Sequence, residues 1–370
     1  MSVKSQNQGI YIAAGILAGA GCAIMVVFPE MALSSAGKGL HLWAESVLPA
    51  MLPFFICANF LVSLGVPSLV GRVFESPFRK LFRAPGSSAF VFMISITSGY
   101  PMGPKMIGEL CHRGEITTAE AKRMLTFCST SGPLFLLGTV GVSMLGSPEA
   151  GISIALAHYS GALLNGWITG LWAPDIKVRR KYYSQIQSSP TGIVDSLTEA
   201  IFSALKTLGL IAGYIVLFTI AADFMELAGA FQILPSPWSK GFLSGILEVT
   251  VGCSQLGSSM LSLQALCSIC TFLVSFGGLS IMAQSMSVLS GSGIHPLYYL
   301  KTKLTQGILS AVLAWFLSPL ILQSAEAAGA FGKGAEGGID LSPWLFSSQL
   351  LILVLLLLFA SALAGRKKAP

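Results

Sequence analysis

A broken apolar stretch decides the fold of this 370-residue chain; it runs from Phe90 to Leu110 and reads FVFMISITSGYPMGPKMIGEL. Gly99, Pro101 and Pro104 interrupt it near the centre. Proline removes a backbone donor and glycine permits turns, so one continuous helix is not expected. Each half is too short to cross a hydrocarbon core of about 30 Å. We therefore predict a re-entrant helical hairpin over residues 86–112, with a tip buried in protein or facing a water-filled cavity.

The composition of the chain agrees with a membrane setting. Hydrophobic residues make up 53% of the sequence and charged residues 10%, whereas soluble proteins carry about 25% charged residues. Mean hydropathy is +0.74. This is too little charge to cover a water-facing surface, which excludes a soluble enzyme and a nucleic-acid binder. Long apolar runs without alternating strands favour an all-α polytopic membrane protein.

Eight further apolar stretches are predicted as membrane-spanning helices, which need about 20 residues each. They cover residues 10–28, 46–65, 121–145, 150–173, 204–228, 262–289, 298–322 and 345–364. A second broken stretch, 241–259, predicts a second re-entrant hairpin. The helix at 10–28 is expected to be retained, because it is not followed by a small-residue cleavage site.

The basic residues orient these spans. With the N-terminus inside and each hairpin entering and leaving on one side, 17 of the 22 Lys and Arg residues, including Lys303, fall in inside segments. Three, Lys38, Lys240 and Lys333, fall outside, and Lys105 and Lys206 fall at or in the membrane. This asymmetry follows the positive-inside rule and predicts that both termini are cytosolic.

The interruptions recur in two units, each ordered as helix, hairpin, broken helix and intact helix. The charge count places the first unit's start outside and the second's inside, so the units are inverted. Inverted units with paired broken helices are typical of secondary transporters that bind their solute near the bilayer midplane. The predicted parts are an N-terminal helix with an outer amphipathic segment (1–44), the first unit (45–175), a cytosolic linker (176–199), the second unit (200–322), an outer loop (323–344) and a C-terminal helix (345–370).

Two motifs carry a family resemblance: SGYPMGPK at 98–105 and FCSTSGPLF at 127–135. They resemble the sporulation integral membrane proteins with nucleoside-recognition (Gate) domains, over about residues 40–320. The likeness is strongest to the stage V members, which are implicated in moving dipicolinic acid from the mother-cell cytosol toward the forespore. The chain is more distantly similar to concentrative nucleoside transporters, but lacks their acidic, Asn/Gln-rich motifs for reading sugar and base. The resemblance implies a dipicolinic acid transporter of the outer forespore membrane.

The candidate substrate-binding residues lie at the four interruptions, where a half-helix N-terminus suits an anion. They are Ser98, Gly99, Tyr100, Gly103 and Lys105 in the first hairpin, Ser129, Thr130, Ser131 and Gly132 in the first broken helix, Thr250, Gly252, Ser254 and Gln255 in the second hairpin, and Ser275, Gly277 and Gly278 in the second broken helix.

Several of these residues have two interpretations. Lys105 is either the countercharge of a carboxylate, or a lysine that reaches the interface or pairs with Glu109. Tyr100 either stacks on an aromatic solute or anchors at the interface. The Ser131-Gly132-Pro133 sequence either binds solute or only kinks a helix. Glu248 either carries a coupling proton or helps bind Na⁺, or it faces a water-filled vestibule and pairs with Lys206.

Other signals are weaker. His158 is expected to be a packed, hydrogen-bonded histidine, and Cys267-x-x-Cys270 small-residue packing, because the four His and seven Cys are scattered. Thr117 and Glu120 predict a helix cap. Neither a cofactor nor a bound metal is expected beyond a coupling Na⁺ or H⁺, and no motif of an intramembrane enzyme occurs.

Three functions remain open. The first is an alternating-access transporter of a small organic anion, most specifically dipicolinic acid. The second is a sodium- or proton-coupled nucleoside-type carrier, and the third a non-transporting scaffold in sporulation. The expected surroundings are the lipid bilayer, and Gly-x-x-x-Gly pairs at 15–19, 166–170 and 209–213 permit close helix contacts and a homo-oligomer.

Overall fold

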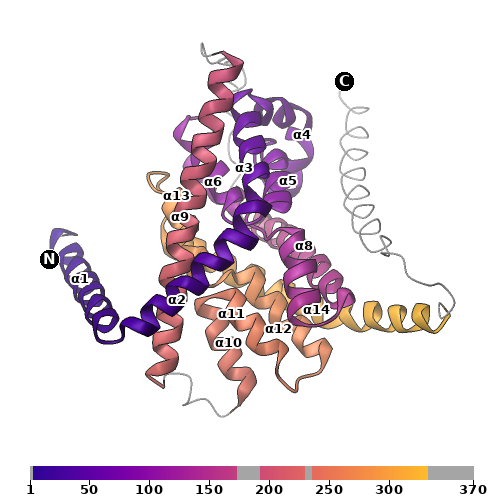
Figure 1. Ribbon diagram of the computed structural model, residues 1–370. Helices are drawn as coiled ribbons and strands as arrows, with labels where there is room; N and C mark the ends of the chain where they lie inside the picture. The colour runs from indigo at the N-terminus through magenta and orange to yellow at the C-terminus, as the bar shows by residue number, and fades with distance from the viewer. Residues whose placement is uncertain (1–2, 173–191, 230–235, 332–370) are drawn as a thin grey trace.

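The computed structural model describes residues 3–172, 192–229 and 236–331. Over these residues the protein is helical and has no strand, as predicted (Figure 1). The elements, of which η1 and η2 are π-helices, are α1 (Val3–Val27), α2 (Pro29–Leu42), η1 (Trp43–Val47), α3 (Leu48–Ser63), α4 (Val66–Phe82), α5 (Ser88–Ser98), α6 (Met102–His112), α7 (Thr118–Leu125), η2 (Leu134–Met144), α8 (Pro148–Leu171), α9 (Ile193–Leu227), α10 (Pro237–Leu247), α11 (Val249–Gly257), α12 (Leu263–Phe276), α13 (Gly278–Val288) and α14 (Pro296–Phe331).

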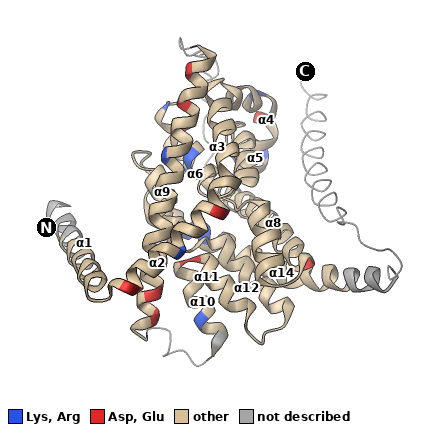
Figure 2. Cartoon of the chain, in the orientation of Figure 1, with Lys and Arg blue, Asp and Glu red and all other residues tan. Residues whose placement is uncertain are grey.

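Three helical segments of the described chain are long and apolar enough to cross a membrane. They are α9, the α12–α13 pair over Leu263–Val288, and Pro296–Gln323 of α14. They match the spans predicted at 204–228, 262–289 and 298–322. Along α9, charged residues lie toward the two ends and leave an uncharged middle between Lys206 and Asp223 (Figure 2).

The other predicted spans are bent, less apolar or interrupted in the structure, or lie outside the described residues. Two bent pairs bring the number of spans in the described chain to at most five, if each pair is one span: Ala18–Val27 with Pro29–Glu45, at 110°, and Met51–Ser63 with Val66–Phe82, at 80°. Helix α8 has 24 residues, but its buried His158 and Asn165 make it less apolar. The span expected at 121–145 is instead α7, a non-helical segment and η2. Residues 345–364 lie outside the described residues, so eight spans are not confirmed.

The expected interruptions are present. Gly99–Pro101 separates α5 from α6, and Thr126–Pro133 separates α7 from η2. Glu248 separates α10 from α11, which pack side by side as a helical hairpin (Figure 1). Gly277, in the left-handed region at φ +86°, separates α12 from α13.

The first unit also contains a helix that the sequence did not predict. Helix α4 lies between the predicted first helix and the first hairpin and carries Arg72, Arg79 and Lys80. It buries Phe78 and Phe82, and Phe82 stacks on Phe127 with ring centroids 4.5 Å apart. Helix α4 therefore anchors the end of α7 from one side. The predicted cap at Thr117 and Glu120 is confirmed as a reciprocal capping box at the start of α7.

The interior has two apolar clusters. One surrounds the phenylalanines of α4 and the Phe127 ring that follows α7, and the other joins η2, α8, α11 and α12. Cys267 and Cys270 are buried in the second cluster as free thiols, in agreement with the packing interpretation. Helices α8, α12 and α14 pack against one another beside this cluster (Figure 1).

Candidate functional site

Each hairpin packs against the interruption of its own unit. At Gly99, which has φ +75°, an added Cβ would lie 2.8 Å from the Gly132 backbone nitrogen. At Gly278 an added Cβ would lie 3.1 to 3.3 Å from the carbonyl oxygens of Gly245, Leu247 and Ile246 at the end of α10. Backbone meets backbone at both places, so these glycines are needed for close approach and are not free to contact a solute.

Two side chains link the interruptions of the two units. His158 of α8 accepts a hydrogen bond at Nε2 from the Ser131 amide, at 2.9 Å, and its Nδ1 lies 2.7 Å from Ser275 Oγ. Tyr100, in the first hairpin tip, donates to the carbonyls of Val274 and Ser275 at 3.3 and 3.4 Å. The predicted packing role of His158 is therefore observed at a position that joins the two units.

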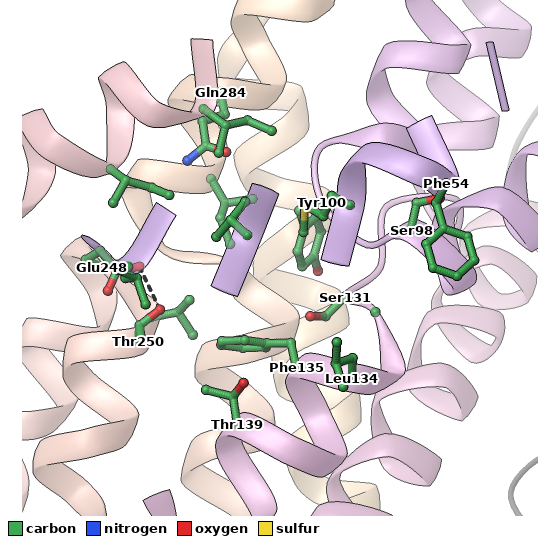
Figure 3. A pocket seen from close by; sticks show the side chains of 18 of the residues that line it. Phe54, Ser98, Tyr100, Ser131, Leu134, Phe135, Thr139, Glu248, Thr250 and Gln284 are labelled. Carbon is green, nitrogen blue, oxygen red and sulfur yellow. Dashed lines mark hydrogen bonds between the residues drawn. The ribbon is translucent and has the colours of Figure 1, made fainter. Parts of the chain in front are cut away.

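A pocket of about 190 Å³ opens where the interruptions meet. In Figure 3, Glu248 and Thr250 lie on the opposite side from Ser98 and Phe54, with Tyr100 and Ser131 between them. The lining residues are Leu42, Val47, Met51, Phe54, Thr97, Ser98, Tyr100, Ser131, Gly132, Leu134, Phe135, Thr139, Ile211, Ile215, Glu248, Val249, Thr250, Ile281 and Gln284. Both units thus contribute to one mostly apolar pocket with a few polar groups.

Six of the predicted residues line this pocket: Ser98, Tyr100, Ser131, Gly132, Glu248 and Thr250. The buried Ser98 hydroxyl has no hydrogen-bond partner among the described residues. Phe135, Thr139 and Gln284 were not predicted. The only sequence signal for them was their position within the helical turns that follow the interruptions at 133 and 277.

The remaining predicted residues do not line the pocket. Ser129 and Thr130 are buried, and their hydroxyls lie 2.9 Å from Tyr299 Oη and Ser95 Oγ respectively. Gly103 packs against the Cys128 carbonyl and Gly252 against Gly245. Ser254 is exposed, Gln255 is half-buried, and Gly277 and Gly278 form the bend between α12 and α13.

Lys105 is held away from the pocket. Its Nζ donates to Asn59 Oδ1 of α3 at 2.8 Å and to Ser203 Oγ of α9 at 2.9 Å. The alternative pairing with Glu109 is not observed, because Glu109 pairs with Arg113 at 2.8 Å. Lys105 therefore connects α6 to two other helices.

Glu248 caps a helix at the pocket wall. Its carboxylate accepts from the Val251 amide at 2.9 Å and from the Thr250 hydroxyl at 3.2 Å. Its side chain is buried, and Lys206, its other predicted partner, is exposed on α9. The Glu248 side chain thus occupies the start of α11, where a helix N-terminus favours an acidic group.

Sequence reasoning missed one charged residue. Lys303, counted among the inside basic residues, is instead buried in α14 with 1% of its surface exposed. Its Nζ donates to Tyr100 Oη at 2.7 Å, to the Ser129 carbonyl at 2.8 Å and to Gln306 Oε1 at 2.7 Å. Lys303 therefore gives no information on orientation. The available signal was the helical spacing of Tyr299, Lys303 and Gln306, which lie on one face.

The fold and the pocket define a helical integral membrane protein whose interrupted helices surround a central pocket. The chain is 29% identical over 327 residues to the sporulation integral membrane protein YlbJ of Bacillus subtilis (strain 168), covering 80% of this chain and 79% of that protein. This similarity supports a sporulation membrane protein family and a membrane role in sporulation. No family model matches the chain, and no solved structure matches it.

Proposed function

We propose that this protein is an alternating-access carrier of a small organic anion, with dipicolinic acid as its solute. It would move the acid from the mother-cell cytosol across the outer forespore membrane, with both termini in the cytosol. One observation carries the proposal: a single pocket is lined by the interruptions of both units, Ser131–Gly132 from the first and Glu248–Thr250 from the second. Paired broken helices around a shared site are typical of secondary transporters.

The pocket offers suitable chemistry for an aromatic acid. Ser131, Gly132 and Leu134 bring the start of η2 to its wall, where the partial positive charge of a helix N-terminus favours a carboxylate. Ser98 has a hydroxyl without a partner among the described residues, and Phe135 and Tyr100 present aromatic rings. A pocket of about 190 Å³ is smaller than the roughly 300 to 1,000 Å³ of drug-sized sites, in keeping with a one-ring solute.

Glu248 is the candidate residue for coupling transport to a proton or Na⁺. A dianion beside an ionised carboxylate would be repelled, so a proton or Na⁺ at Glu248 would accompany solute binding. The membrane potential also favours export of anions, by about 2.3 kcal/mol per charge per 100 mV. Coupling at Glu248 therefore adjusts the pocket charge and need not supply the driving force.

A second candidate is an uncharged, nucleoside-type solute. The observation in its favour is that Glu248, Thr250 and Gln284 are hydrogen-bonding groups on one side of the pocket, while neither Lys nor Arg is among the described lining residues. Hydroxyls and amides of a neutral solute would fit such a wall without a change in charge.

The test is flux in liposomes that contain the full-length protein. Labelled dipicolinate and uridine are offered with and without Na⁺ and proton gradients. We expect dipicolinate flux in the wild type, its loss in Thr139→Trp, which fills the pocket, and its retention in Ser143→Trp, an exposed position one turn further along η2. Flux of uridine alone would favour the second candidate. Absence of both fluxes under every gradient would contradict both transport candidates and leave the scaffold function.

A further inference from the structure

Lys303 is a buried lysine whose hydrogen bonds are complete. Its Nζ has three acceptors within 2.8 Å: the Tyr100 hydroxyl, the Ser129 carbonyl and the Gln306 amide oxygen. An ammonium group has three N–H donors and no acceptor. Tyr100 uses its own proton toward the carbonyls of Val274 and Ser275. The arrangement around Nζ therefore matches the charged form of the lysine.

This positive charge has no carboxylate partner among the described residues, since its three contacts are all uncharged groups. The surface lysines differ: Lys38 pairs with Asp223 and Lys240 with Glu226. Glu248 does not offset it by contact, because its carboxylate is held by the Val251 amide and the Thr250 hydroxyl. A buried charge without an opposite charge is costly, which makes it a candidate for function inside a membrane protein.

The charge lies directly behind the pocket wall. Tyr100 lines the pocket, and Lys303 Nζ is 4.7 Å from the centre of its ring. Ser129, whose carbonyl binds Nζ, is two residues before the lining residue Ser131. Because the buried Tyr100 side chain lies between the ammonium group and the pocket, the field of that charge is weakly screened there.

We infer that Lys303 makes the central pocket selective for anionic solutes. Its charge acts across Tyr100 and the backbone of Ser129 as the countercharge of a bound carboxylate. The inference rests on the proposed function and identifies Lys303 as the residue that determines which solute charge the pocket prefers. It assigns to Lys303 the countercharge role that was one of the two interpretations of Lys105 from the sequence. Lys303 is a positioning and electrostatic group, since Tyr100 stands between it and the pocket.

The experiment compares two probes of one shape: isophthalate, a dianion, and isophthalamide, its uncharged diamide. Binding to the full-length protein in nanodiscs is measured for the wild type, Lys303→Gln and Lys303→Arg. Gln keeps hydrogen bonds but removes the charge, whereas Arg keeps the charge. The matched control is Lys301→Gln, an exposed lysine two residues earlier on α14.

We expect the wild type to prefer the dianion. Lys303→Gln should lower isophthalate affinity by about tenfold or more, the scale of one charge interaction in a partly screened interior. Isophthalamide affinity should not change, Lys303→Arg should keep the preference, and Lys301→Gln should match the wild type. If Lys303 had only a structural role, its replacement would lower the affinity for both probes alike.

Equal losses for the two probes, unchanged isophthalate affinity in Lys303→Gln, or a wild type that binds the diamide as tightly as the dianion would each overturn the inference. If Lys303→Gln does not fold, Lys303→Met tests the same step, because it removes the charge and keeps a long side chain; an unchanged preference ratio would then overturn the inference. Dianion preference without dipicolinate flux would contradict the proposed function only. Dipicolinate flux that persists in Lys303→Gln would contradict this inference only.

Discussion

The imidazole of His158 lies 2.7 Å from the Ser275 hydroxyl through Nδ1 and accepts from the Ser131 amide through Nε2. Because Nε2 is the acceptor, the ring carries its hydrogen on Nδ1 and donates it to Ser275. One side chain of α8 therefore holds the interruptions of the first and second units in a fixed relation. The pocket lies beside this connection, since Ser131 lines it.

His158→Ala should destabilise the protein. It leaves the buried Ser131 amide and Ser275 hydroxyl without this partner, at a cost of about 1–3 kcal/mol for each unsatisfied group. We expect a lower midpoint of thermal unfolding in detergent. His41→Ala, at an exposed position on α2, should leave the midpoint nearly unchanged. Equal midpoints for the wild type and His158→Ala would show that the connection does not contribute to stability.

Gly103→Ala should disrupt the first hairpin by overlap. An added Cβ would lie 1.8 Å from the Cys128 carbonyl oxygen, so backbone must move, and overpacking of this kind costs about 1–3 kcal/mol or more. Gly209→Ala is the control, because nothing lies within 4 Å of its added Cβ and alanine favours a helix by about 1 kcal/mol. The purified yield and the midpoint of thermal unfolding are measured for both variants. A Gly103→Ala protein as stable as Gly209→Ala would refute the close packing of α6.

Glu248→Gln should uncouple transport from its ion gradient. The amide keeps an oxygen for the Val251 amide, but it cannot take up a proton or attract Na⁺ as the carboxylate does. Flux in liposomes should respond to a proton or Na⁺ gradient in the wild type and lose that response in the variant. Glu149→Gln, at the start of α8 outside the pocket, should respond like the wild type. A gradient response that survives Glu248→Gln would exclude this residue as the coupling site.

Lys105→Ala should reduce dipicolinate flux. The variant removes the hydrogen bonds to Asn59 and Ser203 by which Lys105 connects α6 to α3 and α9. Lys105→Arg should keep part of the flux, and Lys206→Ala, at an exposed lysine of α9, should keep all of it. The measurement is initial uptake at equal protein density. Unchanged flux in Lys105→Ala would show that Lys105 does not contribute to transport.

The interruptions could be predicted from the sequence because they depend on local chemistry. Gly99 and Gly277 adopt positive φ angles, and the prolines at 101 and 133 lack the backbone N–H that a continuous helix would need at those positions. The cap at Thr117 and Glu120 was predictable for the same reason, since both partners lie within one turn.

The partners of the long polar side chains could not be predicted, because they come from distant segments. Lys303 was counted with the basic residues of an inside segment, but its side chain is buried in the structure and Tyr100, 203 positions away, accepts its hydrogen bond. Lys105 likewise meets Ser203, 98 positions along the chain. Helix α4 was missed because its charged and apolar residues alternate around the helix, which lowers its hydropathy below that of a span.

The contact between Gly99 and Gly132 limits how fast the pocket can open on that side. Two backbones touch there, so no side chain exists at the joint whose rotamer could flip aside within picoseconds to nanoseconds. Separating them requires the whole first hairpin to move against η2, and collective helix motions take microseconds to milliseconds. If the protein is the carrier proposed above, solute exchange past this joint is limited by the rate of helix displacement.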